Sequence, residues 1–224
     1  MEVTISRSAI RMAWRPGGLI YLAVLLAGTA AGLWSEAIHP SQEAAVSSVL
    51  PTLKTLSIAQ AMFILLVYPL VSLWRLEAEA PPFWPVMIGE SAVCMLLSLP
   101  FYLVCGYLAD ATVTDVGRVA IYAGLLWPVG WIASRAVRLP RARAVMVLFV
   151  LLLTLGGPAI YYITLEFLNS AGASTVFHAC PLTFLWELAD ARQASLWPRP
   201  VWASLLWPGA FIVGALAMIS IRRA

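Results

Sequence analysis

Charged residues are scarce in this chain of 224 residues. Only 11% of them are Asp, Glu, Lys or Arg, and 62% are apolar, whereas a soluble globular domain carries about 25% charged residues. The mean hydropathy is +0.87. This composition argues against a water-soluble domain and is typical of a polytopic membrane protein, so we expect an all-α fold.

The chain also lacks the motifs of common active sites and cofactor sites. It has no Walker A phosphate loop, no Rossmann glycine turn and no zinc-finger spacing. Neither of its two histidines, His39 and His178, falls inside an apolar run, although a helix-bound haem or an intramembrane serine protease would need one there. We therefore expect no catalysis by this chain alone, no cofactor and, without a basic soluble domain, no nucleic acid partner.

Cysteine is rare, and its placement argues against a disulfide framework. Cys94 and Cys105 fall in one apolar run, where cysteine behaves as a small hydrophobe. His178 and Cys180 stand two residues apart and could give two ligands to copper or zinc, with His39 as a third. An ordinary polar loop explains the same residues, and we predict no metal site.

Six apolar segments have about the length needed to cross a bilayer, which takes about 20 residues. Together they predict one domain of six transmembrane helices over residues 1–224, with Arg118 at an interface and with no polar residue at mid-membrane positions. The predicted spans are 17–34, 56–74, 86–108, 117–134, 144–164 and 201–221. Arginines precede the first span as in a signal peptide, but no cleavage site is evident, so we expect a retained helix.

The basic residues predict the orientation of these spans. With the N-terminus in the cytoplasm, ten of the fourteen basic residues lie on the inner side, including the cluster at 135–143, and four lie outside. By the positive-inside rule both termini are then cytoplasmic. Thirteen arginines against one lysine are typical of a GC-rich genome, and we expect a bacterial inner membrane.

Three local features predict how the helices pack and bend. Gly28 and Gly32 stand four residues apart and permit close approach of a second helix. The sequence Gly156-Gly157-Pro158 interrupts the fifth span, and Pro128 and Pro208 lie inside the fourth and sixth spans, where a proline removes a backbone hydrogen bond and favours a kink.

A short acidic connection, which we call the elbow (75–85), follows the second span in the sequence WRLEAEAPPFWP. Paired prolines end one helix, and Pro85 suits the first turn of the next. The result is a stiff, acidic and aromatic turn that a soluble partner could bind, although a tight loop with solvated charges explains the composition equally.

Glu90 lies about one turn into the third span. An intramembrane acid is costly and is therefore a candidate functional residue. Two alternatives remain open: the carboxylate reaches the nearby interface, or it pairs with Arg75.

The order of these features resembles the membrane subunit of the type-2 ABC exporter permease family. The resemblance covers essentially the whole chain and rests on the basic amphipathic N-terminus, the Arg/Glu-rich elbow, Gly89-Glu90 opening the third span, the tight basic turn between spans four and five, the broken fifth span, Cys180-Pro-Leu-Thr-Phe-Leu-Trp186, and the terminal Arg222-Arg223.

The resemblance implies roles for several segments. Residues 1–16, with Arg11 and Trp14, would form an interfacial helix on membrane lipid, and residues 165–200 an outer re-entrant or surface segment. The elbow would couple the chain to a separate ABC ATPase subunit, and a second permease subunit, identical or not, would complete the transport path. The coupling residues would be Arg75, Glu77, Glu79, Phe83, Trp84 and Pro85.

The alternative function is a non-catalytic scaffold or anchor subunit of a larger membrane complex. The expected absence of mid-membrane polar residues favours it, because a path for ions normally contains them. A stand-alone secondary transporter is disfavoured, because no inverted repeat and no mid-span charge is evident.

Overall fold

The computed structural model describes residues 16–38, 51–74, 83–138, 140–151, 154, 156–163, 166 and 180–190. Within these residues the protein is all-helical and has no strand. In chain order its helices are α2 (Pro16–Ile38), α3 (Pro51–Met62), the π-helix η1 (Phe63–Val67), α4 (Tyr68–Trp74), α5 (Phe83–Leu108), α6 (Val113–Leu125), α7 (Trp127–Arg138), α8 (Pro140–Leu151), α9 (Gly157–Ile163) and α11 (Pro181–Asp190).

Four segments of the described chain are long and apolar enough to cross a membrane. They are Gly17–Ser35, Thr52–Val71, Ile88–Leu108 and Val113–Ser134. They correspond to the first four predicted spans. The second and fourth begin four residues before the predicted starts at 56 and 117, and the added residues of the second include Lys54, which is buried within the protein.

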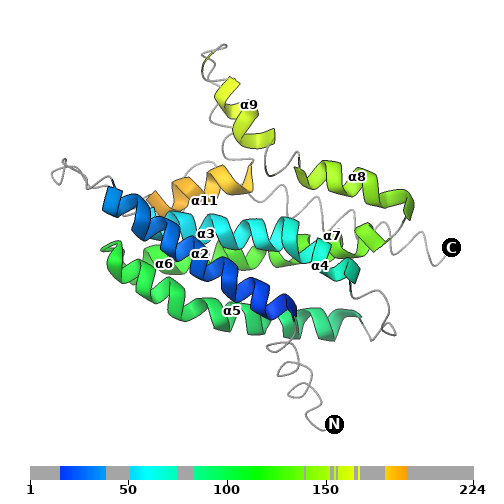
Figure 1. Cartoon of the computed structure of the whole chain (residues 1–224), viewed down its shortest axis with the longest axis horizontal. Helices are drawn as coiled ribbons and strands as arrows, with labels where there is room; N and C mark the ends of the chain where they lie inside the picture. Colours follow the sequence, from blue (N-terminus) through cyan, green and yellow to red (C-terminus); the bar gives the residue numbers. More distant parts are fainter. Residues whose placement is uncertain are drawn as a thin grey trace, which may run out of the picture.

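The last two predicted spans have different outcomes. Of the fifth, the structure describes α8 with 12 residues and α9 with 7, each too short to cross a bilayer by itself, whereas residues 152, 153 and 155 between them lie outside the described residues. Figure 1 shows α9 standing across the direction of α8, and the sequence Gly156-Gly157-Pro158 lies at the start of α9. The sixth predicted span and the two termini fall outside the described residues, so their placement stays a prediction.

The four spans lie side by side as a bundle, with α2, α3 to α4, α5 and α6 to α7 running along a common direction (Figure 1). Their shared core is mainly aromatic and aliphatic and includes Tyr21, Phe63, Tyr122 and Trp127, each at most 2% exposed. Large apolar side chains also cover the outside of the bundle, as expected where lipid replaces water.

Helices α2 and α3 pack closely because glycine leaves room for the facing backbone. A Cβ atom added at Gly28 would lie 2.7 Å from Cβ of Ala59, and one added at Gly32 would lie 2.5 Å from Cα of Thr52. Real Cβ atoms do not approach so closely, so only glycine fits this packing. The prediction that Gly28 and Gly32 form a helix contact is confirmed.

Two of the spans are interrupted. A turn at Leu126 separates α6 from α7, and the Leu126 N–H donates to the Ala123 carbonyl at 3.2 Å. Pro128 has no N–H to continue the helix pattern, so the predicted break at this proline is confirmed. In the second span, η1 inserts a π-turn between α3 and α4, which the sequence analysis did not predict.

Helix α11 covers one end of the bundle and packs against α3 and α6 (Figure 1). Its residues Phe184, Leu185 and Leu188 are fully buried, and the Phe184 ring lies 4.7 Å from the Tyr122 ring, centroid to centroid. With 10 residues it is too short to span a bilayer. It belongs to the segment 165–200 that the sequence assigns to the outer side, the same side as the starts of α3 and α6.

Candidate functional site

Glu90 is buried between the two helices that flank the elbow. It is 7% exposed and lies in α5, and the hydroxyl of Tyr68, the first residue of α4, donates a hydrogen bond to its Oε2 atom at 2.8 Å. The carboxylate is therefore held within the protein, and the two alternatives for it, the nearby interface and Arg75, stay predictions. Its hydrogen bond joins α4 to α5 within two of the candidate spans, and polar groups in apolar surroundings favour partners within the protein.

An aromatic cluster surrounds Tyr68 on its other side. The Tyr68 ring meets the edge of Trp127 at 5.2 Å between centroids, and Phe63 lies within 6.5 Å of both rings. Such edge contacts are favourable and geometrically specific. Phe63 is the first residue of η1, and Trp127 is the first residue of α7. The cluster therefore holds the π-turn in contact with the break between α6 and α7.

A second buried polar group lies near the middle of the candidate spans, centred on Gln60 of α3. We call it the polar core: Tyr21, Gln60, Ser98 and Tyr102. The Gln60 amide nitrogen donates to Tyr21 Oη at 2.9 Å and to Ser98 Oγ at 3.5 Å, and the Tyr102 hydroxyl donates to Gln60 Oε1. Each of the four is buried.

The polar core contradicts the expectation that the middle of the membrane lacks polar residues. Gln60 and Ser98 lie near the centres of the spans Thr52–Val71 and Ile88–Leu108. They are tolerated there because their polar atoms bond to one another across α2, α3 and α5. The sequence signal for the polar core was a glutamine inside an apolar run. A second signal was the spacing of four residues between Ser98 and Tyr102, which places them on one face of α5.

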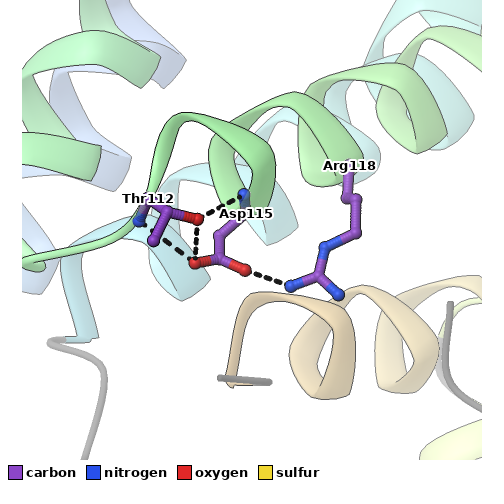
Figure 2. Close-up of polar contacts among 3 residues, drawn as sticks. All are labelled: Thr112, Asp115 and Arg118. Atoms are coloured by element: carbon purple, nitrogen blue, oxygen red, sulfur yellow. Dashed lines mark hydrogen bonds and ion pairs between the residues drawn. The ribbon is translucent and has the colours of Figure 1, made fainter. Parts of the chain in front are cut away.

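Charged residues gather at the end of the bundle that α11 covers. Thr112 caps α6: its Oγ1 accepts the Asp115 backbone N–H at 3.2 Å, and Asp115 Oδ2 accepts the Thr112 N–H at 3.1 Å. Asp115 also forms an ion pair with Arg118, which is 3% exposed. Figure 2 shows these three side chains along the first turns of α6, with Arg118 extending in the direction of α11.

Lys54, near the start of α3, is a further charged residue at this end of the bundle. Its side chain is buried, and Nζ lies 4.9 Å from the ring centroid of Trp186 on α11, which is within cation–π range. Lys54 therefore links α3 to α11, while Arg118 and Asp115 are linked within α6. Arg118 is buried and paired within the protein, and its expected place at a membrane interface stays a prediction.

Replacing Thr112 with alanine removes the cap of α6. We expect the free energy of unfolding to fall by about 1 kcal/mol, because the Asp115 N–H loses its side-chain acceptor. The measurement is thermal unfolding of the detergent-purified protein. Thr114→Ala is the matched control, since Thr114 is exposed in the same helix turn, and equal losses for both variants would contradict a role for the cap.

The structure describes only part of the predicted coupling region. Phe83, Trp84 and Pro85 form the first turn of α5, so the predicted helix start near Pro85 is confirmed. The other predicted coupling residues, Arg75, Glu77 and Glu79, lie outside the described residues, as do Arg11 and Trp14 of the predicted interfacial helix.

The low-ranking metal candidates are likewise only partly described. Cys180 is buried directly before α11, and His178 lies outside the described residues. Among the residues that the structure describes, no three His, Cys, Asp or Glu side chains come close enough to hold a metal ion.

No protein-family model matches the chain, and no match was found among curated proteins or solved structures.

Proposed function

We propose that this chain is a permease subunit of an ABC-type exporter in a bacterial inner membrane, driven by a separate ATPase subunit. The observation that carries the proposal is the buried Tyr68–Glu90 hydrogen bond. It joins the two helices on either side of the elbow, so that a force on the elbow would move α4 and α5 together.

Two elements next to this hydrogen bond, η1 and the polar core, would respond to such a force. Helix α4 continues directly from η1, and π-turns are frequent at functional sites. Beyond η1, Gln60 of α3 bonds to α2 and α5 through the polar core. A displacement of α4 would therefore change either the π-turn or the polar core, at the depth where a transport path between two permease subunits would lie.

The elbow supplies the chemistry for docking. Its Glu77 and Glu79 are acidic, and we propose that they bind a basic surface on the ATPase subunit. Charge complementarity of this kind selects partners and fixes their orientation. The family resemblance assigns the same segment to coupling and supports the proposal independently of the hydrogen bond.

The test is purification of the tagged chain from its native membrane in mild detergent. We expect an ATPase subunit with a phosphate loop in stoichiometric amount. Changing Glu77 and Glu79 together to Lys should lower its recovery at least about tenfold, because like charges would then face each other.

The matched control reverses two acids on the predicted outer side, Glu36 and Glu43, and should leave recovery unchanged. Full recovery of the ATPase with the elbow variant would show that the elbow is not the docking surface.

A scaffold or anchor subunit is the second candidate, and the outer face of α5 favours it. Leu96, Leu99, Leu103 and Tyr107 follow one another along this helix and are 48% to 86% exposed. The apolar stripe could bind another membrane subunit as well as lipid. Recovery of structural or redox subunits with no ATPase in the same purification would favour this candidate.

A further inference from the structure

An apolar groove opens beside the second span. It has a volume of about 80 Å³ and lies between η1 and α4 on one side and α8 on the other. We call it the α4–α8 groove. Leu65 and Val150 line its buried part, with 0% and 4% exposure, whereas Leu70 and Leu151 form its exposed rim, with 49% and 39% exposure.

The groove adjoins the most basic segment of the chain. Helix α7 ends and α8 begins in a sequence that carries four arginines, and residues 116–165 contain no Asp or Glu. These arginines occupy the last turns of α7 and the first turn of α8: Arg135, Arg138, Arg141 and Arg143. The turn therefore has a strong positive charge with no acid nearby in the sequence.

The helix register places the groove just below this turn. At about 1.5 Å per residue, Val147 lies about 9 Å and Leu151 about 15 Å along α8 from Arg141. Helix α4 ends at Trp74, at the same end of the bundle as the start of α8 (Figure 1), so Leu70 lies about 6 Å from that end. With the α7–α8 turn at the membrane surface, as the positive-inside rule predicts, the groove lies at acyl-chain depth within one leaflet, which is about 15 Å thick.

We propose that this region binds an anionic phospholipid, with one acyl chain in the α4–α8 groove and the phosphate headgroup at the arginines of the α7–α8 turn. The apolar lining selects a hydrocarbon chain, and the four positive charges select an anionic headgroup over a zwitterionic one. Each arginine near a membrane surface favours anionic lipid by about fivefold. The site is separate from the elbow and goes beyond the proposed function.

The first test fills the groove. The full-length chain is reconstituted with equal amounts of phosphatidylglycerol and phosphatidylcholine, extracted, and examined by native mass spectrometry for retained lipid. We expect the parent chain to retain phosphatidylglycerol, and Val147→Phe to lower the retained amount at least about threefold, by placing a phenyl ring in the half-buried lining.

Val145→Phe is the matched control for this test. Val145 is 70% exposed, is not among the groove-lining residues and lies two residues away on α8. The control should retain phosphatidylglycerol like the parent chain. Equal retention by the two phenylalanine variants would overturn the groove as the acyl-chain site.

The second test removes charge from the turn. Changing Arg141 and Arg143 together to Gln should reduce the preference for phosphatidylglycerol over phosphatidylcholine about tenfold or more, whereas changing both to Lys should preserve it. Arg135 and Arg138 remain in both variants and keep the positive-inside bias. An unchanged preference in the Gln variant, or equal retention of the two lipids by the parent chain, would overturn the anionic lipid. Recovery of the ATPase is measured separately and tests only the elbow.

Discussion

Gly32→Ala is expected to destabilise the protein by about 2 to 3 kcal/mol, although alanine is the better helix former. The added Cβ would lie 2.5 Å from the Cα atom of Thr52 and 2.5 Å from the side-chain oxygen of Thr55, both in α3. A side chain can turn away from such a contact, but the backbone at Thr52 cannot move without shifting α3. The helices α2 and α3 would have to separate, with loss of the contacts along their whole length.

Gly117→Ala provides the matched control, because it makes the same change in another helix of the bundle. No heavy atom lies within 4 Å of a Cβ added at Gly117, so helix propensity alone should raise stability by about 0.5 to 1 kcal/mol. The two variants are compared by thermal unfolding in detergent and by the monodisperse fraction in gel filtration. A result in which both substitutions shift stability in the same direction would contradict the close packing of α2 on α3.

The spacing of Gly28 and Gly32 illustrates what the sequence could predict. Hydropathy located the first four spans to within about four residues, since a continuous apolar run is a strong signal. Small residues four apart indicated a helix contact, and prolines indicated breaks, because each signal depends only on local covalent geometry. Only the structure shows that α3 is the helix that these two glycines contact.

The partners of the buried polar residues could not be predicted from the sequence. Gln60 has partners that are 39 and 42 residues away in sequence, Tyr21 and Tyr102, and no spacing rule connects residues so far apart. Lys54 was left outside the predicted second span, because hydropathy treats a charge as exposed. In the structure Arg118 is paired with Asp115, and Lys54 lies over an aromatic ring of α11.

The π-turn η1 was missed for a similar reason. Its sequence, Phe63–Val67, reads FILLV and is indistinguishable from an ordinary apolar helix. What distinguishes it is the tertiary contact of Phe63 with Tyr21, at 4.7 Å between ring centroids, and the position of Tyr68 directly after it. A π-turn shifts the helix register, and Tyr68 is the first residue whose direction depends on that shift.

Removing either partner of the Tyr68–Glu90 hydrogen bond is expected to lower the free energy of unfolding by about 1 to 2 kcal/mol, the upper range for such bonds in membrane proteins. Tyr68→Phe leaves the buried carboxylate without this donor, and Glu90→Met leaves the hydroxyl without this acceptor. The double variant replaces both by apolar groups of similar shape, so we expect it to be more stable than the less stable single variant. Thermal unfolding of the four proteins in one detergent gives the coupling energy as a double-mutant cycle.

Under the proposed exporter function, the same variants separate binding of the ATPase subunit from transmission of its movement to the helices. Tyr68 and Glu90 lie inside the bundle, so Tyr68→Phe should recover as much ATPase as the parent chain, whereas the elbow variant should not. Additive effects of the two single substitutions on stability would mean that the hydrogen bond does not join α4 to α5 energetically. The elbow could then still bind an ATPase, but its movement would reach only α4 or only α5, and the polar core would have to transmit it between α3 and α5 instead.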